Sequence, residues 1–211
     1  MAIKNIIFDL GGVFIPLNME ATSVGFKNLG AKNFDEIYSQ QTQRHFFDQF
    51  DKGLITPDEF RSELKMFLPN DVTFSKIDEA WNAMLALIPK QKIDFLKKVN
   101  ADYNVFLLSN TNTIHVKKFE TDHLKHYNEN IFQTCFIKTY YSCNMGMRKP
   151  DEEIFHAVIT DSSLIPDETI FIDDSPQHVK GATEAGLKAY HLDLKIDSVE
   201  TLFDKVIRQQ L

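Results

Sequence analysis

Four stretches of this 211-residue chain carry polar side chains that could act together in one chemical step. The first is the apolar run Ile6-Ile7-Phe8, which is followed at once by Asp9 and shortly afterwards by a pair of glycines. Two later apolar runs end in Ser109-Asn110 and in Asp173-Asp174, and Lys149 lies in a loop before another helical segment. In an open α/β sheet, ligands bind beyond the carboxyl ends of the strands, so a carboxylate in that position can reach them.

Carboxylates gathered at one edge of a sheet repel one another, and their pKa values rise unless a cation neutralises them. These stretches offer oxygen ligands and no cluster of thiols or imidazoles, which favours a hard ion such as Mg²⁺. A hydroxyl, backbone amides and one ammonium beside such an ion form a site for a phosphoryl group. An aspartate carboxylate can then be the nucleophile. The pattern predicts phosphoryl chemistry.

Short apolar runs predict the strands that position these residues, because buried strands are brief and rich in β-branched residues. The expected strands are residues 6–8, 105–108, 135–137, 169–172 and 189–192. Periodic apolar positions between them predict helices, for example after Thr56-Pro57 and after Pro150, where acidic residues follow a proline. Alternating strands and helices imply βαβ units. We therefore expect an α/β fold, a Rossmann-like and mainly parallel sheet with helices on both faces.

Residues 16–88 differ from the rest, because their apolar spacing is helical throughout, up to a stretch over residues 73–87. We predict that they form an inserted small all-helical cap over the end of the first strand, and that residues 1–15 and 89–211 form the core. The helical spacing of Phe46, Phe47 and Trp81 predicts that these side chains build the cap's interior rather than stack on a ligand.

Composition excludes several other classes of function. A net charge of −7 argues against a general nucleic-acid binder, which needs a basic face. No apolar run approaches the ~20 residues that cross a bilayer, and the first residues enter a strand without a secretory signal. Cys135 and Cys143 make neither a disulfide framework nor a zinc motif. We expect a cytoplasmic protein with a small-molecule partner and no nucleic-acid or membrane partner. No heptad pattern indicates an oligomeric state.

Four segments resemble the four motifs of the haloacid dehalogenase-like hydrolase superfamily, in the same order and at suitable spacing. They are FDLGGV from Phe8, LSNT from Leu108, RKPD from Arg148 and FIDDS from Phe171. The resemblance covers essentially the whole chain, and the inserted helices are similar to that superfamily's small helical cap. Within that superfamily, three motifs are most similar to those of sugar-1-phosphate phosphatases: Asp-Leu-Gly-Gly, Ser-Asn-Thr-Asn and Gly-Met-Arg-Lys-Pro.

The resemblance implies a magnesium-dependent phosphatase that hydrolyses a small phosphorylated metabolite, such as a sugar phosphate. Asp9 would attack phosphorus and form an aspartyl-phosphate that water then hydrolyses. Mg²⁺ would be held by Asp9, the Gly11 backbone carbonyl and Asp174, with Asp173 binding directly or through water.

The other motif residues would bind the phosphoryl group. Ser109 and the amide of Asn110 would hold phosphate oxygens, and Lys149 would neutralise charge on Asp9 and the phosphoryl group. Taken singly, each residue could instead have a purely structural role. Ser109 and the acidic pair could cap helices, and Lys149 could be an exposed loop lysine.

One position departs from the family pattern. Most phosphatases of this superfamily carry a second aspartate two residues after the nucleophile, as general acid and base, and this chain has Gly11 there. Such help is typically worth ~10²–10⁴-fold, so we expect substrates with good leaving groups, such as an anomeric or acyl phosphate. The candidates for a substitute group are Glu20, His45, Asp48 and His178.

Two alternatives remain open at this point. A 2-haloacid dehalogenase would use the same aspartate without a metal, although two unneutralised acids beside Asp9 would oppose attack by an anion. A non-catalytic regulator or binding protein could keep the fold after losing the acid at the position of Gly11. Turnover of phosphate esters above an Asp9→Asn control would distinguish an enzyme from a binding protein.

Overall fold

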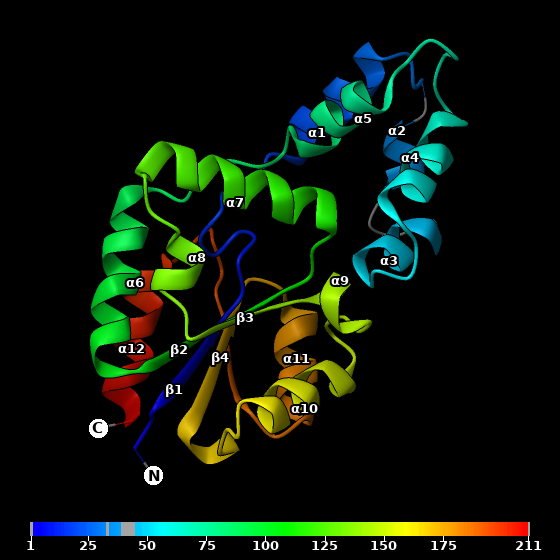
Figure 1. Cartoon of the computed structure of the whole chain (residues 1–211). Coiled ribbons are helices and arrows are strands. Elements are labelled where there is room, and N and C mark those ends of the chain that lie inside the picture. Colours follow the sequence, from blue (N-terminus) through cyan, green and yellow to red (C-terminus); the bar gives the residue numbers. More distant parts are fainter. Residues whose placement is uncertain (1, 33, 39–44, 211) are drawn as a thin grey trace.

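The computed structural model of the chain describes residues 2–32, 34–38 and 45–210. Its centre is a five-stranded sheet with the strand order β3-β2-β1-β4-β5, in which every neighbouring pair is parallel (Figure 1). The strands are β1 (Asn5–Phe8), β2 (Asn104–Ser109), β3 (Lys138–Tyr141), β4 (Thr169–Asp173) and β5 (Lys188–His191). The chain leaves β1 towards β2 on one side and later adds β4 on the other. This topological switch point is where open α/β sheets bind ligands.

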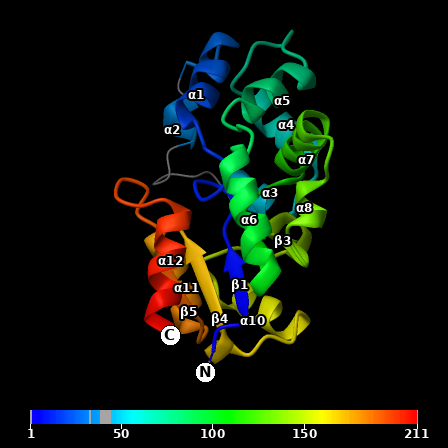
Figure 2. The same ribbon diagram turned by 90° about the vertical axis from the view of Figure 1, so that its left-hand side faces the viewer.

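Helices cover both faces of the sheet, as predicted (Figures 1 and 2). Alternate residues of β1 point to opposite faces: Ile6 and Phe8 pack in one hydrophobic cluster and Ile7 in another. The first cluster takes residues from α6 (Lys90–Asp102), α7 (Thr113–Tyr127), α8 (Ile131–Thr134) and α12 (Val199–Gln210). The second takes residues from α10 (Glu152–Asp161) and α11 (Pro176–Glu184). The short elements α9 (Ser142–Met145) and η1 (Pro166–Glu168) lie in connections.

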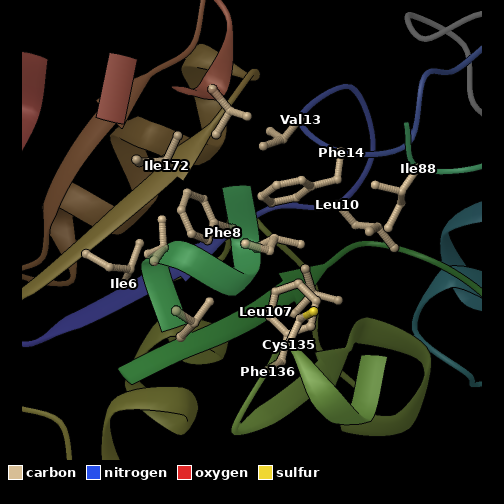
Figure 3. Close-up of a cluster of buried hydrophobic side chains, with 14 of the residues drawn as sticks. Ile6, Phe8, Leu10, Val13, Phe14, Ile88, Leu107, Cys135, Phe136 and Ile172 are labelled. Carbon is tan, nitrogen blue, oxygen red and sulfur yellow. The ribbon is translucent and has the colours of Figure 1, made fainter. Parts of the chain in front are cut away.

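Aromatic packing anchors the loop that follows β1. The ring of Phe14 meets that of Phe8 edge to face, with centroids 5.2 Å apart, and Leu10 and Val13 join the same cluster (Figure 3). Such aromatic pairs add ~0.5–1.5 kcal/mol beyond the area they bury. The turn that carries Gly11 and Gly12 is therefore tied to the core on both sides.

The helices of residues 16–88 lie beyond the carboxyl ends of the strands (Figure 1). They are α1 (Met19–Asn28), α2 (Phe34–Tyr38), α3 (His45–Asp51), α4 (Pro57–Lys65) and α5 (Phe74–Asn82). They share a separate, aromatic-rich cluster, which Ile114 of α7 joins from the core. The chain enters and leaves this unit side by side, because Leu17 and Leu85 form an antiparallel bridge. We therefore propose residues 16–88 as the cap, of which residues 33 and 39–44 lie outside the described part.

Two predicted elements differ from the structure. The predicted strand at residues 135–137 is wrong: Cys135 ends α8, and the edge strand β3 begins only at Lys138. Cys135 and Phe136 are apolar because they fill the core from a loop. The helix expected over 73–87 ends at Asn82, since the residues after it turn to pair with the entering chain. The predicted helix after Thr56 forms, and Thr56 and Glu59 make a reciprocal capping box at its start.

Candidate active site

The ends of β1, β2 and β4 bring three polar residues to one edge of the sheet. The register pairs Phe8 with Ile172, so Asp9 and Asp173 emerge side by side from β1 and β4. The Asp9 N–H donates to the Ile172 carbonyl at 2.9 Å, which keeps Asp9 on the ladder. Ser109 is the last residue of β2, on the other side of β1. All three polar residues are buried.

Lys149 is fully buried between two of the carboxylates. Its Nζ lies 2.6 Å from Asp9 Oδ1 and 2.6 Å from Asp173 Oδ2, and it also donates to the Leu108 carbonyl at 2.9 Å. These three bonds use all three protons of the ammonium. Burial alone would lower the pKa of Lys149, but Asp173 and Asp9 outweigh burial and raise the pKa, so the side chain stays charged. The reading of Lys149 as an exposed loop lysine is wrong.

The side chain of Asn110 fixes the backbone that carries Lys149. Asn110 Oδ1 accepts from the Lys149 N–H at 2.9 Å, and Asn110 Nδ2 donates to the Lys149 carbonyl at 2.8 Å. This reciprocal pair holds the lysine loop against the end of β2. The phosphate-binding role of Asn110 stays a prediction, and it rests on the backbone N–H because the side-chain amide is engaged.

Asp9, Asp173 and Asp174 form a group that could hold a metal ion. Each offers a carboxylate oxygen, and the three oxygens lie within 4.8 Å of one another. Gly12 makes room for this group: it has a φ of 74°, and a Cβ there would lie 2.2 Å from Asp174 Oδ2. A set of carboxylate oxygens with the Gly11 carbonyl nearby in sequence suits a hard divalent ion, and the residues fit Mg²⁺.

The electrostatics of the group also favour a cation. Burial is the largest influence on Asp9 and, against the opposing effect of Lys149, raises its pKa to about 7. Burial and the neighbouring Asp173 raise the pKa of Asp174 as well. For Asp173, burial is outweighed by Lys149 and His178, and the pKa falls to about 2. A divalent ion would offset the remaining negative charge and keep Asp9 and Asp174 ionised.

A cavity of about 220 Å³ lies between the helices of residues 16–88 and the strand ends, and the residues that follow Asp9 in its loop, Leu10 and Gly11, line it. Gly11 and Ser109 line it from the core, whereas Phe47, Trp81 and Asp51 line it from the cap. Phe46, Phe47 and Trp81 are buried in the aromatic cluster of residues 16–88, as predicted. Phe47 and Trp81 also line the cavity, so their burial alone does not support the prediction that they do not contact a ligand.

Asn112 joins the cap to the core at this cavity. Its Oδ1 accepts from the His115 N–H at 3.1 Å, which caps α7, and from Trp81 Nε1 at 3.4 Å. Its Nδ2 donates to Asp51 Oδ1 at 3.3 Å. The cap of α7 is thus Asn112, so the reading of Ser109 as that helix cap is wrong. The sequence prediction missed Asp51, Asn112 and His115, because nothing in the spacing shows which cap residues face the core.

The four predicted substitutes for the missing acid do not line the cavity, although His178 contacts a carboxylate of the site. Asp48 pairs with Arg148 at 2.6 Å, and His178 Nδ1 lies 3.0 Å from both oxygens of Asp173. Glu20 and His45 are exposed on α1 and α3. None of the four is among the described residues that line the cavity. The structure thus brings together Asp9, Lys149, Asp173 and Asp174, whereas their individual catalytic roles stay predictions.

Comparison with known proteins agrees with this geometry. The family model for haloacid dehalogenase-like hydrolases matches residues 3–186. The chain is 30% identical to a D-ribitol-5-phosphate phosphatase from Bacteroides thetaiotaomicron, over 89% of this chain and 91% of that protein. It is 29% identical to a sesquiterpene phosphatase from Aspergillus oryzae, over 95% and 94%. A crystal structure of a HAD family enzyme from B. thetaiotaomicron, in complex with magnesium and inorganic phosphate, is 40% identical with a TM-score of 0.88, covering 96% of this chain and all of the other.

The chain belongs to the haloacid dehalogenase-like hydrolase family. Within that family it is a magnesium-dependent phosphatase, since two relatives of matching length are phosphatases, a 40% identical enzyme was crystallised with magnesium and phosphate, and the carboxylate group of this chain suits Mg²⁺. Among the described residues, no helix is long and apolar enough to span a membrane.

Proposed function

We propose that this phosphatase hydrolyses a sugar phosphate, or a closely related polyol phosphate, through an aspartyl-phosphate on Asp9. The observation that carries the proposal is the place of the Asp9 carboxylate. It lies at the end of the central strand, 2.6 Å from a buried ammonium, and the next residues of its loop line a cavity of about 220 Å³. The phosphatase named for D-ribitol-5-phosphate supports a polyol-like substrate.

The chain's own residues account for the two displacements. Lys149 holds one oxygen of Asp9, so the other oxygen is oriented for attack on phosphorus. The ammonium also balances the charge of Asp9 and the incoming phosphoryl group. Ser109, which lines the cavity, would donate its hydroxyl to a phosphoryl oxygen. Asp9, Asp173, Asp174 and the Gly11 carbonyl would hold Mg²⁺, which when bound stabilises negative charge on the phosphoryl oxygens.

The alternatives fit the site less well. In a 2-haloacid dehalogenase without a metal, the acidic pair beside Asp9 would oppose attack by an anion, and a single ammonium faces these three carboxylates among the described residues. A non-catalytic regulator would have no need for a lysine buried at the nucleophile, which is costly to keep. The cytoplasmic location stays a prediction.

A turnover assay tests the proposal. Purified protein is given D-ribitol-5-phosphate, a panel of sugar phosphates and p-nitrophenyl phosphate, with Mg²⁺ or with EDTA. We expect Mg²⁺-dependent release of phosphate, lost in Asp9→Asn. Release that continues in Asp9→Asn would refute the role of Asp9, and activity confined to 2-haloacids would refute the function.

A further inference from the structure

The leaving oxygen of an alkyl phosphate needs a proton as its bond to phosphorus breaks. Gly11 has no side chain to supply one, and Lys149 uses its three protons on Asp9, Asp173 and the Leu108 carbonyl. We propose that Asp51, at the end of α3 in the cap, is the general acid and base of this phosphatase. The inference depends on the proposed function, and it adds a catalytic residue.

The geometry singles out Asp51 within the cavity. Among the described residues that line it, Asp51 is the one carboxylic acid, and Gly11 from the loop after Asp9 and Ser109, the proposed phosphate ligand, line the same cavity. Two other titratable groups are less suited. Burial lowers the pKa of His115 to about 3 and raises the pKa of Tyr38 well above its usual range, so both stay neutral near pH 7.

Two hydrogen bonds to Asp51, and a close backbone approach two residues later, hold this end of α3 against the core. Ser142 Oγ donates to the Asp51 carbonyl at 2.6 Å, while the same hydroxyl lies 2.9 Å from the Thr111 N–H, which donates to it. Asn112 Nδ2 donates to Asp51 Oδ1 at 3.3 Å. The loop after Asp51 lies directly on the core, because a Cβ at Gly53 would sit 2.0 Å from the Cys143 carbonyl oxygen. The backbone of Asp51 and one of its carboxylate oxygens are thus held in place at the cavity.

The surroundings of Asp51 place its titration near neutral pH. Burial is the largest influence and raises its pKa to about 6, whereas Arg148 and the Asn112 hydrogen bond oppose the rise and Asp48 adds to it. Burial likewise raises the pKa of the neighbouring Cys143 thiol to about 11, so that group is uncharged. A carboxyl group of this kind can give up and recover a proton in one cycle.

Asp51 loses one proton in the first step and regains one in the second. As the Asp9 oxygen bonds to phosphorus and the bond from phosphorus to the leaving oxygen breaks, the Asp51 acid donates its proton to that oxygen and becomes a carboxylate. This carboxylate then takes a proton from water while the water oxygen attacks phosphorus. The bond between Asp9 and phosphorus breaks, which releases phosphate and restores both side chains.

The test compares two leaving groups in Asp51→Asn, which keeps the shape of the side chain. The leaving group of D-ribitol-5-phosphate is an alkoxide, which needs the proton. The leaving group of p-nitrophenyl phosphate is p-nitrophenolate, which is stable without one. We expect kcat/KM, which reports the steps up to departure of the leaving group, to fall by ~10²–10⁴-fold for the alkyl phosphate and far less for the aryl phosphate. Hydrolysis of the aspartyl-phosphate is common to both substrates, so a loss of kcat there affects both alike. The wild-type decline of the alkyl activity above pH about 6 should disappear in the variant.

Asp48→Asn is the matched control, because Asp48 lies on the same helix and faces Arg148 instead of the cavity. It should keep the wild-type ratio of alkyl to aryl kcat/KM, and thermal unfolding of both variants checks that they are folded. Equal losses of kcat/KM on both substrates in Asp51→Asn, or an unchanged ratio and pH profile of kcat/KM, would overturn the role of Asp51. Activity retained in Asp9→Asn would instead refute the proposed function.

Discussion

Gly12 is the position where a single methyl group should disable metal binding. Its φ of 74° lies in the left-handed region, which is unfavourable for any other residue by ~1–2 kcal/mol. A Cβ there would also lie 2.2 Å from Asp174 Oδ2 and 2.8 Å from Asp174 Cγ. In Gly12→Ala, the Asp174 carboxylate must therefore leave its place beside Asp9 and Asp173.

Displacing a group that orients a metal ligand typically costs 10–100-fold in metal affinity, and here a proposed ligand itself moves. We therefore expect the Mg²⁺ dissociation constant, measured by calorimetric titration, to rise at least ~10–100-fold in Gly12→Ala. This corresponds to a loss of ~1.4–2.7 kcal/mol of binding free energy. Urea unfolding in EDTA should show the backbone cost separately.

Gly186→Ala is the matched control for this variant. Gly186 has a φ of 89°, so alanine there loses a similar amount of stability to backbone strain, but its Cβ would meet no atom within 4 Å. It should lose ~1–2 kcal/mol of stability and bind Mg²⁺ as the wild type does. Wild-type Mg²⁺ affinity in Gly12→Ala would show that Asp174 is not a ligand.

Two further substitutions test the buried polar groups. Lys149→Met leaves Asp9 and Asp173 buried without their cation, so urea unfolding in EDTA should show a loss of ~3–5 kcal/mol, which Mg²⁺ partly restores; unchanged stability would contradict the pairing. His115→Phe keeps a ring against Trp81 and removes an Nδ1 that has no hydrogen-bond partner among the described residues. Because burial lowers the His115 pKa from 6.5 to about 3, the unfolded chain takes up that proton first. The wild type should therefore lose more stability than the variant between pH 6.5 and 3, and parallel pH dependences would contradict the shift.

The central part of the site could be predicted from local patterns. Each of Asp9, Ser109 and Asp173 follows or ends an apolar run, and parallel strands must deliver such residues to one edge. The approach of Asp174 to Asp9 follows from the adjacency of β4 and β1. Lys149 could be picked out as a loop lysine near these residues, but its burial between Asp9 and Asp173 could not be predicted, because no periodicity shows that a loop lysine is buried.

Other features depend on contacts between distant segments. The bonds of Asn112 to Trp81 and Asp51 join residues 31 and 61 positions apart, and no local signal marks them. The Asn110 side chain binds the Lys149 backbone. Its position in the motif does not show whether the side chain binds that backbone or a phosphate. The misplaced strand at 135–137 has the same origin, since a loop that fills the core has the apolar residues of a strand.

The stereochemical course at phosphorus tests the central claim most directly. The measurement uses a substrate with an isotopically chiral thiophosphoryl group, hydrolysed in water labelled with the third oxygen isotope, and reads the configuration of the thiophosphate that is released. Attack by Asp9 and then by water means two in-line displacements, so net retention is expected. Net inversion would mean that water attacks the substrate directly and that Asp9 is not the nucleophile.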